Sequence, residues 1–201
     1  MKAPVTLFCL FTATASTHAA TIVSTATATG AYTFAAPEDI AVVGWYQPDT
    51  YTDITIQLPI SGFGFVPSGT IQLIDRLGPG SGPQDVIATT TVSFFGSSVV
   101  AFSGLTLPAG YYNIVVSNAT GAYWETVDAL AQYTKGPGIE LLPPHTGTGH
   151  GPFPPADIQD VRAVGLSFSV TGNLIPEPSA VALIAAATAA HALRRRRGRP
   201  I

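Results

Sequence analysis

Apolar and polar residues alternate along several short stretches in the middle of the chain. In residues 52–58, isoleucine or leucine takes every second position and polar residues take the positions between. Residues 70–77 repeat this alternation through Ile71 and Leu73. Because successive side chains of a β-strand point to opposite faces, a period of two predicts half-buried strands.

Other segments are rich in β-branched and aromatic residues and are bounded by Gly, Pro, Asn or Asp, as strands commonly are. They lie at 41–46, 86–95, 98–102 and 164–170. Ala122-Tyr123-Trp124 is also predicted to start a strand.

A hairpin is predicted around residues 108–110, Pro-Ala-Gly, because a three-residue loop that ends in glycine is a common hairpin geometry. Residues 105–107 would form the end of its first strand. Tyr112, Ile114 and Val116 would line one face of the return strand.

Three segments are less regular. Residues 21–30 are interpreted either as a first edge strand or as disordered, residues 126–133 as a short helix, and residues 136–155 as a Pro/Gly/His/Thr-rich loop. No segment shows a sustained period of 3.6 residues. The pattern predicts an all-β domain over residues 21–173, an antiparallel β-sandwich of jelly-roll or immunoglobulin-like layout.

The first 20 residues have the three parts of a secretory signal peptide. Lys2 provides a basic start, residues 5–11 an apolar core, and small residues a cleavage region. Cleavage after Ala19 is favoured over cleavage after Ala20, which would put His18 at one of the two selective positions.

Residues 174–201 form a tail of three parts. Pro176, Glu177 and Pro178 come first, an apolar run occupies 179–193, and Arg194, Arg195, Arg196 and Arg197 follow. The run has 15 residues, and as a helix it would cover roughly 22 Å of a bilayer core about 30 Å thick. Positive flanks stay on the cytoplasmic side, so the body before Pro176 would lie outside. We expect a segment that enters the inner membrane transiently. A permanent tail anchor is an alternative, while a basic arm that binds nucleic acid fits badly because it would need no apolar helix.

The order Pro176-Glu177-Pro178, apolar helix and arginine cluster closely resembles the PEP-CTERM sorting signal, over the last 26 residues. The resemblance implies a bacterial protein and a membrane-embedded exosortase, a cysteine transpeptidase-like enzyme, as its processing partner. That enzyme would cut near the Pro-Glu-Pro and release or transfer the protein.

The body between the two ends is acidic. Residues 21–175 carry three basic and eleven acidic side chains, a formal charge of −8 against −3 for the whole chain. Without a basic patch for phosphate contacts, we expect no nucleic-acid partner. The only cysteine, Cys9, would leave with the signal peptide, so the mature body must hold together by its core alone.

Catalytic chemistry has little support in the body. His145 and His150 lie in the predicted loop without a Gly-x-Ser-x-Gly nucleophile motif or a nearby Cys or Glu, which argues against a hydrolase triad and against zinc. We therefore expect no enzyme, no catalytic residues and no residues dedicated to a metal.

Paired carboxylates leave two alternatives open. Glu125 with Asp128, and Asp157 with Asp160, would serve glycoside hydrolysis if they faced each other across a cleft. The alternative is that these carboxylates are solvated at the surface or bind a structural calcium ion at a loop, and neither role requires a cleft. Glu38-Asp39 is interpreted as a turn cap.

Aromatic residues are the candidates for ligand binding. Trp45, Tyr46, Tyr51, Tyr123 and Trp124 could present rings to a carbohydrate, although aromatic residues in strands commonly fill the core. If both tryptophans are buried, this hypothesis loses its main support.

These patterns predict an exported, non-enzymatic bacterial protein of the envelope or the extracellular polysaccharide matrix, with a structural or adhesive role. The alternative is a carbohydrate-binding module that recognises extracellular polysaccharide, and a third hypothesis is a secreted hydrolase.

Overall fold

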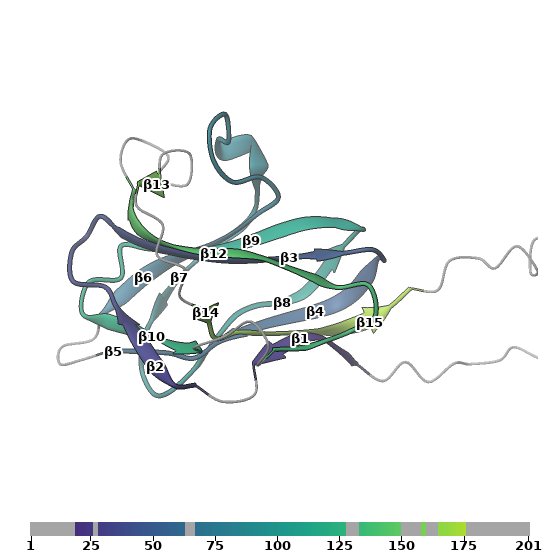
Figure 1. The fold of residues 1–201 in the computed structure, drawn as a ribbon, viewed down its shortest axis with the longest axis horizontal. Helices are drawn as coiled ribbons and strands as arrows, with labels where there is room; N and C mark the ends of the chain where they lie inside the picture. The colour runs from purple at the N-terminus through teal and green to yellow at the C-terminus, as the bar shows by residue number, and fades with distance from the viewer. Residues whose placement is uncertain are drawn as a thin grey trace, which may run out of the picture.

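The computed structural model describes residues 19–25, 28–62, 67–127, 133–149, 158–159 and 165–175. This part of the chain consists of β-strands and one short 3-10 turn, Pro83–Asp85, with no α-helix. All its strand pairs are antiparallel. The prediction of an all-β, antiparallel fold is therefore confirmed (Figure 1).

Sheet A is five-stranded, in the order β11–β1–β15–β4–β8. Its strands are β1 (Ala20–Thr25), β4 (Tyr51–Leu58), β8 (Val99–Leu107), β11 (Tyr133–Lys135) and β15 (Ser169–Leu174). The alternation of β4 holds, because Ile54, Ile56 and Leu58 are fully buried while the residues between them face outward. β1 lies between two other strands, so its interpretation as an edge strand was wrong.

Sheet C is six-stranded, in the order β13–β12–β3–β9–β6–β7. Its strands are β3 (Asp39–Gln47), β6 (Ser68–Ile74), β7 (Val86–Ser93), β9 (Gly110–Ser117), β12 (Glu140–Gly149) and β13 (Ile158–Gln159). Sheet B is small, with β10 flanked by β2 on one edge and by β14 and β5 on the other. Its strands are β2 (Gly30–Thr33), β5 (Ile60–Gly62), β10 (Ala122–Val127) and β14 (Gly165–Leu166).

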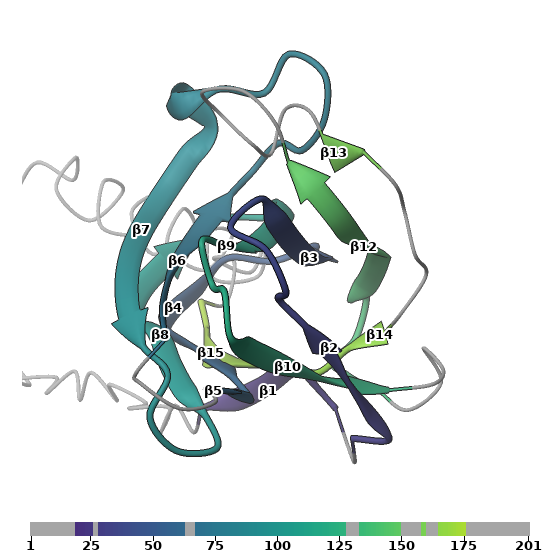
Figure 2. The same ribbon diagram turned by 90° about the vertical axis from the view of Figure 1, so that its left-hand side faces the viewer.

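Sheets A and C face each other, and sheet B continues the layer of sheet A at one end (Figures 1 and 2). One cluster of buried side chains lies between the layers, and it includes Trp45 and Ile114 of sheet C, Ile56 of sheet A and Trp124 of sheet B. A smaller cluster, formed by Ile40, Val42, Ile74 and Val115, covers the other face of sheet C. Because β3 and β9 are buried on both faces, their sequences are apolar runs rather than alternating ones.

The predicted hairpin around residues 108–110 is wrong. β8 pairs with β4 in sheet A, whereas β9 pairs with β3 and β6 in sheet C, so the turn carries the chain from one layer to the other. The Tyr112 hydroxyl donates to the Pro108 carbonyl oxygen at 2.7 Å and fixes this crossing. The predicted face of β9 is confirmed, because Tyr112, Ile114 and Val116 are all buried.

The predicted loop at 136–155 is also wrong over much of its length. Residues 140–149 form β12, which pairs with β3 from Glu140 to Leu142 and from His145 to Thr148. The two prolines fall where the register shifts between Leu142 and His145, a place where a strand tolerates residues without an N–H donor.

Two further predictions of secondary structure are wrong. Thr126 and Tyr133, the ends of the predicted short helix, lie in β10 and β11, and residues 128–132 are outside the described part. The single strand predicted at 164–170 is divided between β14 in sheet B and β15 in sheet A.

The predicted signal peptide and sorting tail lie almost entirely outside the described residues, which begin at Ala19 and end at Ile175. Among the described residues, no helix has the length and apolar character needed to cross a membrane.

A buried hydrogen-bond chain holds the crossing between β8 and β9. Trp45 Nε1 donates to Gln47 Oε1 at 2.9 Å. The Gln47 amide then donates to the carbonyl oxygens of Leu107 at 3.0 Å and Pro108 at 3.1 Å. Gln47 is fully buried, and its bonds to Trp45 and to the Leu107 carbonyl oxygen are buried with it.

We expect Gln47→Leu to destabilise the protein, because it leaves the buried Trp45 indole N–H without its acceptor and removes the donor to the carbonyl oxygens of Leu107, Pro108 and Asp49. The free energy of unfolding should fall by about 3 kcal/mol, measured by urea denaturation followed through tryptophan fluorescence. The control is Gln57→Leu, an exposed amide bonded to Ser98 Oγ, which should change stability by less than about 0.5 kcal/mol. Equal effects of the two substitutions would contradict the role of Gln47.

Candidate functional site

The aromatic residues predicted to bind a ligand do not form a common site. Trp45 and Trp124 are both fully buried, so the prediction that they present rings to a ligand is wrong. Trp124 Nε1 donates to the Ser167 carbonyl oxygen at 2.6 Å, which gives this ring a structural role. Tyr46 and Tyr123 are half-buried and belong to different sheets.

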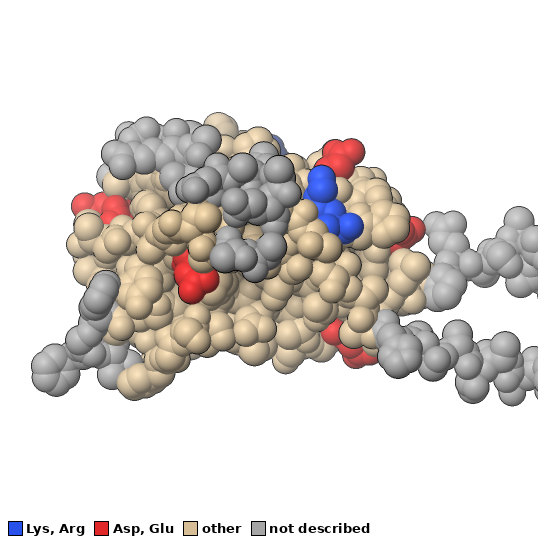
Figure 3. Space-filling model, turned by 60° about the horizontal axis from the view of Figure 1, so that its bottom comes forward, with Lys and Arg blue, Asp and Glu red and all other residues tan. Residues whose placement is uncertain are grey.

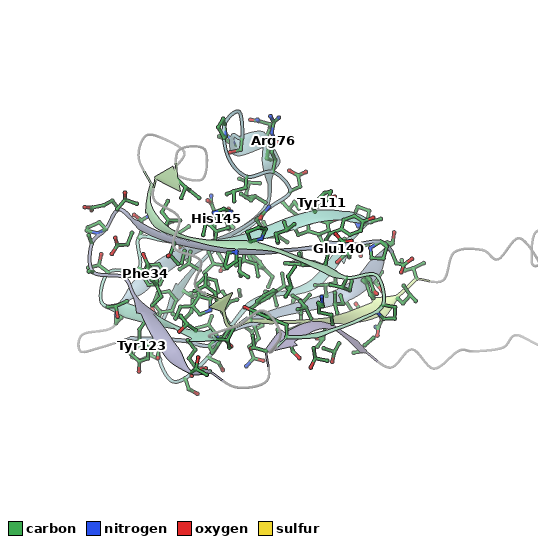
Figure 4. All side chains as sticks on the ribbon, viewed as in Figure 1. Phe34, Arg76, Tyr111, Tyr123, Glu140 and His145 are labelled. Carbon is green, nitrogen blue, oxygen red and sulfur yellow. The ribbon has the colours of Figure 1, made fainter. Side chains whose placement is uncertain are left out.

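The exposed ring that the sequence prediction missed is Tyr111, at the start of β9. Its side chain is 55% exposed, and its ring centroid lies 4.8 Å from that of Tyr46 on the neighbouring strand, with a 42° angle between the ring planes. Figure 4 shows Tyr111 on the outer face of sheet C. Alternation along β9 places Tyr111 on the face opposite to Tyr112, but Asn113 and Val115 on that same face are buried, so alternation alone does not predict that Tyr111 is exposed.

A groove of about 620 Å³ opens beside Tyr111. Three segments enclose it: the chain after β6, the start of β7 and the crossing from β8 to β9. Its lining residues are Asp75, Arg76, Asp85, Ile87, residues 106–110, Tyr111 and Tyr112. The crossing held by Gln47 therefore forms one wall of the groove.

The groove contains both hydrogen-bond acceptors and a cationic donor. Asp75 and Asp85 come together because the Asp75 amide donates to the Asp85 carbonyl oxygen at 3.1 Å. Asp85 Oδ2 accepts from the Gly82 amide at 2.8 Å and from Gln84 Nε2 at 3.1 Å, which orients that carboxylate. Burial, and secondarily the nearby Asp75 carboxylate, raise the pKa of the Tyr112 hydroxyl. An aromatic ring beside two carboxylates, one of them held by hydrogen bonds, and a guanidinium can hold a polyhydroxylated ligand.

A second, smaller hollow of about 260 Å³ lies where sheet A bends into sheet B. It is lined by polar side chains that include Glu125, Gln57 and Ser98. Gln57 Nε2 donates to Ser98 Oγ at 2.9 Å, and the hydroxyls of Thr25 and Ser167 contact each other. Four of the polar side chains of this hollow therefore bond to one another in two pairs.

The predicted carboxylate pairs are not tested as pairs, since Asp128, Asp157 and Asp160 lie outside the described residues. Asp39 behaves as predicted for a turn cap, because its Oδ2 accepts hydrogen bonds from the amides of Ala35 at 2.5 Å and Ala36 at 2.8 Å. Within the described ranges, no three His, Cys, Asp or Glu side chains gather as metal ligands would. The residues of the predicted sorting signal, 176–178 and 194–197, also lie outside the described part.

The surface of sheets A and B offers little further chemistry. Figure 3 shows that this side of the molecule is mostly uncharged, with isolated acidic and basic residues. The aromatic groove on sheet C is therefore the best-formed candidate site in the described part of the chain.

The comparisons with known proteins give no relative to guide this assignment: no family model, curated protein or solved structure matches the chain.

His145 lies in β12 and is half-buried, while His150 lies outside the described residues. Burial lowers the pKa of His145 from its ordinary value of 6.5. The folded protein therefore binds this proton less readily than the unfolded chain. Its stability contribution is complete above about pH 6.5 and is lost as the pH falls below that value.

We expect the melting temperature of the wild-type protein to fall between pH 7.5 and pH 5.5. In His145→Gln, which removes the titrating group, the fall should be smaller. Differential scanning calorimetry at both pH values measures the difference. An unchanged pH dependence in the variant would show that His145 does not contribute.

Proposed function

We propose that this chain is an exported bacterial protein of the envelope or extracellular polysaccharide matrix, non-enzymatic, with a structural or adhesive role. An exosortase-type enzyme would process it at Pro176-Glu177-Pro178, after the apolar segment 179–193 and the arginine cluster have held the precursor in the inner membrane. The proposal rests mainly on the order of these three parts at the C-terminus.

The position of the chain ends supports this proposal. Ala20 pairs with Gly172, so β1 and β15 lie side by side and both ends of the domain leave it on the same side (Figure 1). β1 begins at the residue that signal cleavage after Ala19 would expose, and β15 ends at Leu174, where the tail is predicted to begin. A domain with this arrangement can be displayed from a single point of attachment.

The finer fold proposed is a β-sandwich in which sheets A and C form the two layers. The Tyr112 hydroxyl bond to a carbonyl four residues upstream, at a crossing between layers, is similar to the tyrosine corner of immunoglobulin-like sandwiches. This favours the immunoglobulin-like alternative over the jelly roll.

The intact mass of the protein from the cell surface and medium of its native host tests the processing. We expect a mass that lacks residues 1–19 and everything beyond the Pro-Glu-Pro region. Glu177→Ala should retain the tail, whereas Glu140→Ala, at an exposed position of β12, should not. A wild-type mass that still contains residues 194–201 would contradict processing and indicate a plain membrane anchor.

The second candidate function is recognition of a neutral polysaccharide at the groove beside Tyr111. One observation favours it. The exposed Tyr111 ring packs against Tyr46 and lies in a groove that is also lined by Asp75, Asp85 and Arg76. The acidic body would repel polyanions, which leaves neutral chains as the better ligands. Glu140 of β12 pairs with Tyr46 of β3 and so adds a carboxylate beside the two tyrosine rings of sheet C.

Affinity electrophoresis in gels that contain dextran or galactomannan, with alginate as the acidic comparison, tests this function. We expect retardation by a neutral polymer, and about a tenfold loss of affinity in Tyr111→Ala because the stacking surface is removed. Val100→Ala is the control, since Val100 is 56% exposed but does not line the groove. Equal retardation of the two variants would exclude the groove as the site.

A further inference from the structure

The edges of the three sheets differ in how well they are protected. Unpaired edge strands can pair with another chain, and proteins block this by keeping the edges short, charged or bulged. Among the described residues, β13, β14, β2 and β11 are edge strands of two to four residues, and β11 ends in Lys135. β8, the other edge of sheet A, is long, but its register with β4 shifts at three points.

β7 has none of these protections. This edge strand of sheet C runs for eight residues, VIATTTVS, without a charge, a proline or a glycine. Its pairing with β6 is regular from Ser93 to Ala88, and the only shift lies at its first residue, Val86. Ile87, Thr89, Thr91 and Ser93 are exposed in strict alternation. Threonine and valine favour extended structure, so the strand is suited to accept a partner.

We propose that β7 pairs antiparallel with β7 of a second copy of this chain, so that the two C sheets join into one continuous sheet. Such pairing is isologous and closes after two copies, which gives a dimer rather than a fibre. Figure 2 shows β7 at the margin of the molecule, along its full length.

The distribution of charge favours a second copy of the chain as the partner of β7. The body is acidic, so two copies repel each other over most of their surface. β7 and its neighbour β6 carry no charge, and the nearest acid in sequence is Asp85. In a pair centred on Thr90, the two Asp85 residues would be separated by about ten residues of strand, roughly 34 Å, several times the Debye length of about 8 Å.

Apolar surface favours the same arrangement. Ile87 is 40% exposed near the start of β7, and Phe95 is 67% exposed two residues beyond its end. Antiparallel pairing brings the start of one β7 to the end of the other, so each Ile87 would approach the partner copy's Phe95. Burial of these side chains would stabilise the dimer beyond the backbone hydrogen bonds.

Light scattering after size-exclusion chromatography tests the proposal on the full chain, in a polyoxyethylene detergent that carries no sugar. At protein concentrations up to about 200 μM, which detect dissociation constants near 10⁻⁴ M, we expect a wild-type dimer. Thr89→Lys with Thr91→Lys, and separately Thr89→Glu with Thr91→Glu, place like charges opposite each other and should each weaken dimerisation at least tenfold. A mixture of the two variants should dimerise again.

The matched control is Ser103→Lys with Thr106→Lys, at exposed positions of the bulged edge β8, which should remain dimeric. Association through the C-terminal tail would not respond to charges on β7, so unchanged dimerisation of both β7 variants would overturn the proposal. A monomeric wild type, or a failure of the mixed variants to associate, would also overturn it. The outcome does not depend on whether the tail is processed.

Discussion

Two buried indole N–H groups impose the constraint on which this architecture depends. A buried donor without an acceptor costs roughly 1–3 kcal/mol, and both Trp45 and Trp124 are fully buried. Trp45 donates to Gln47, which holds the carbonyl groups where the chain passes from sheet A to sheet C. Trp124 donates to the Ser167 carbonyl oxygen, where the chain passes from sheet B to sheet A. Each indole thus satisfies its N–H at a point where the chain changes sheets.

A tyrosine hydroxyl adds to each of these crossings. Tyr112 bonds to the Pro108 carbonyl oxygen at one, and Tyr133 bonds to the Leu166 carbonyl oxygen at the other. Burial raises the pKa of Tyr133 to about 12, so its hydroxyl remains a donor far above neutral pH. Since residues 19–175 contain no cysteine, no disulfide joins the layers, and hydrogen bonds at the crossings supplement the packing of the core.

The sequence allows prediction of strands and of their buried faces where these follow from neighbouring residues. The period of two identified β4 and the buried face of β9, because alternation depends only on neighbouring residues. It could not reveal which sheet a strand joins, so the turn at 108–110 was interpreted as a hairpin although the flanking strands belong to different layers. The same limit affected the site: Trp45 was chosen for its residue type, whereas Tyr111 is exposed at the start of β9, on a face of sheet C that is buried further along the strand.

The chain ends belong to sheet A, whereas the groove and the β7 edge belong to the opposite layer and meet at Ile87, which lines the groove. In the proposed dimer each groove would therefore lie beside the contact between the two copies. Antiparallel edge pairing relates the copies by a two-fold axis perpendicular to the sheet, so both Tyr111 grooves would open on the same side of the joined C sheets. The chain ends belong to sheet A in the opposite layer and would face the other way. Two linked sites engage a repetitive polymer more tightly than either site alone, because the second contact is intramolecular. Dimerisation would therefore increase the avidity of a weak polysaccharide site without any additional contact to the ligand.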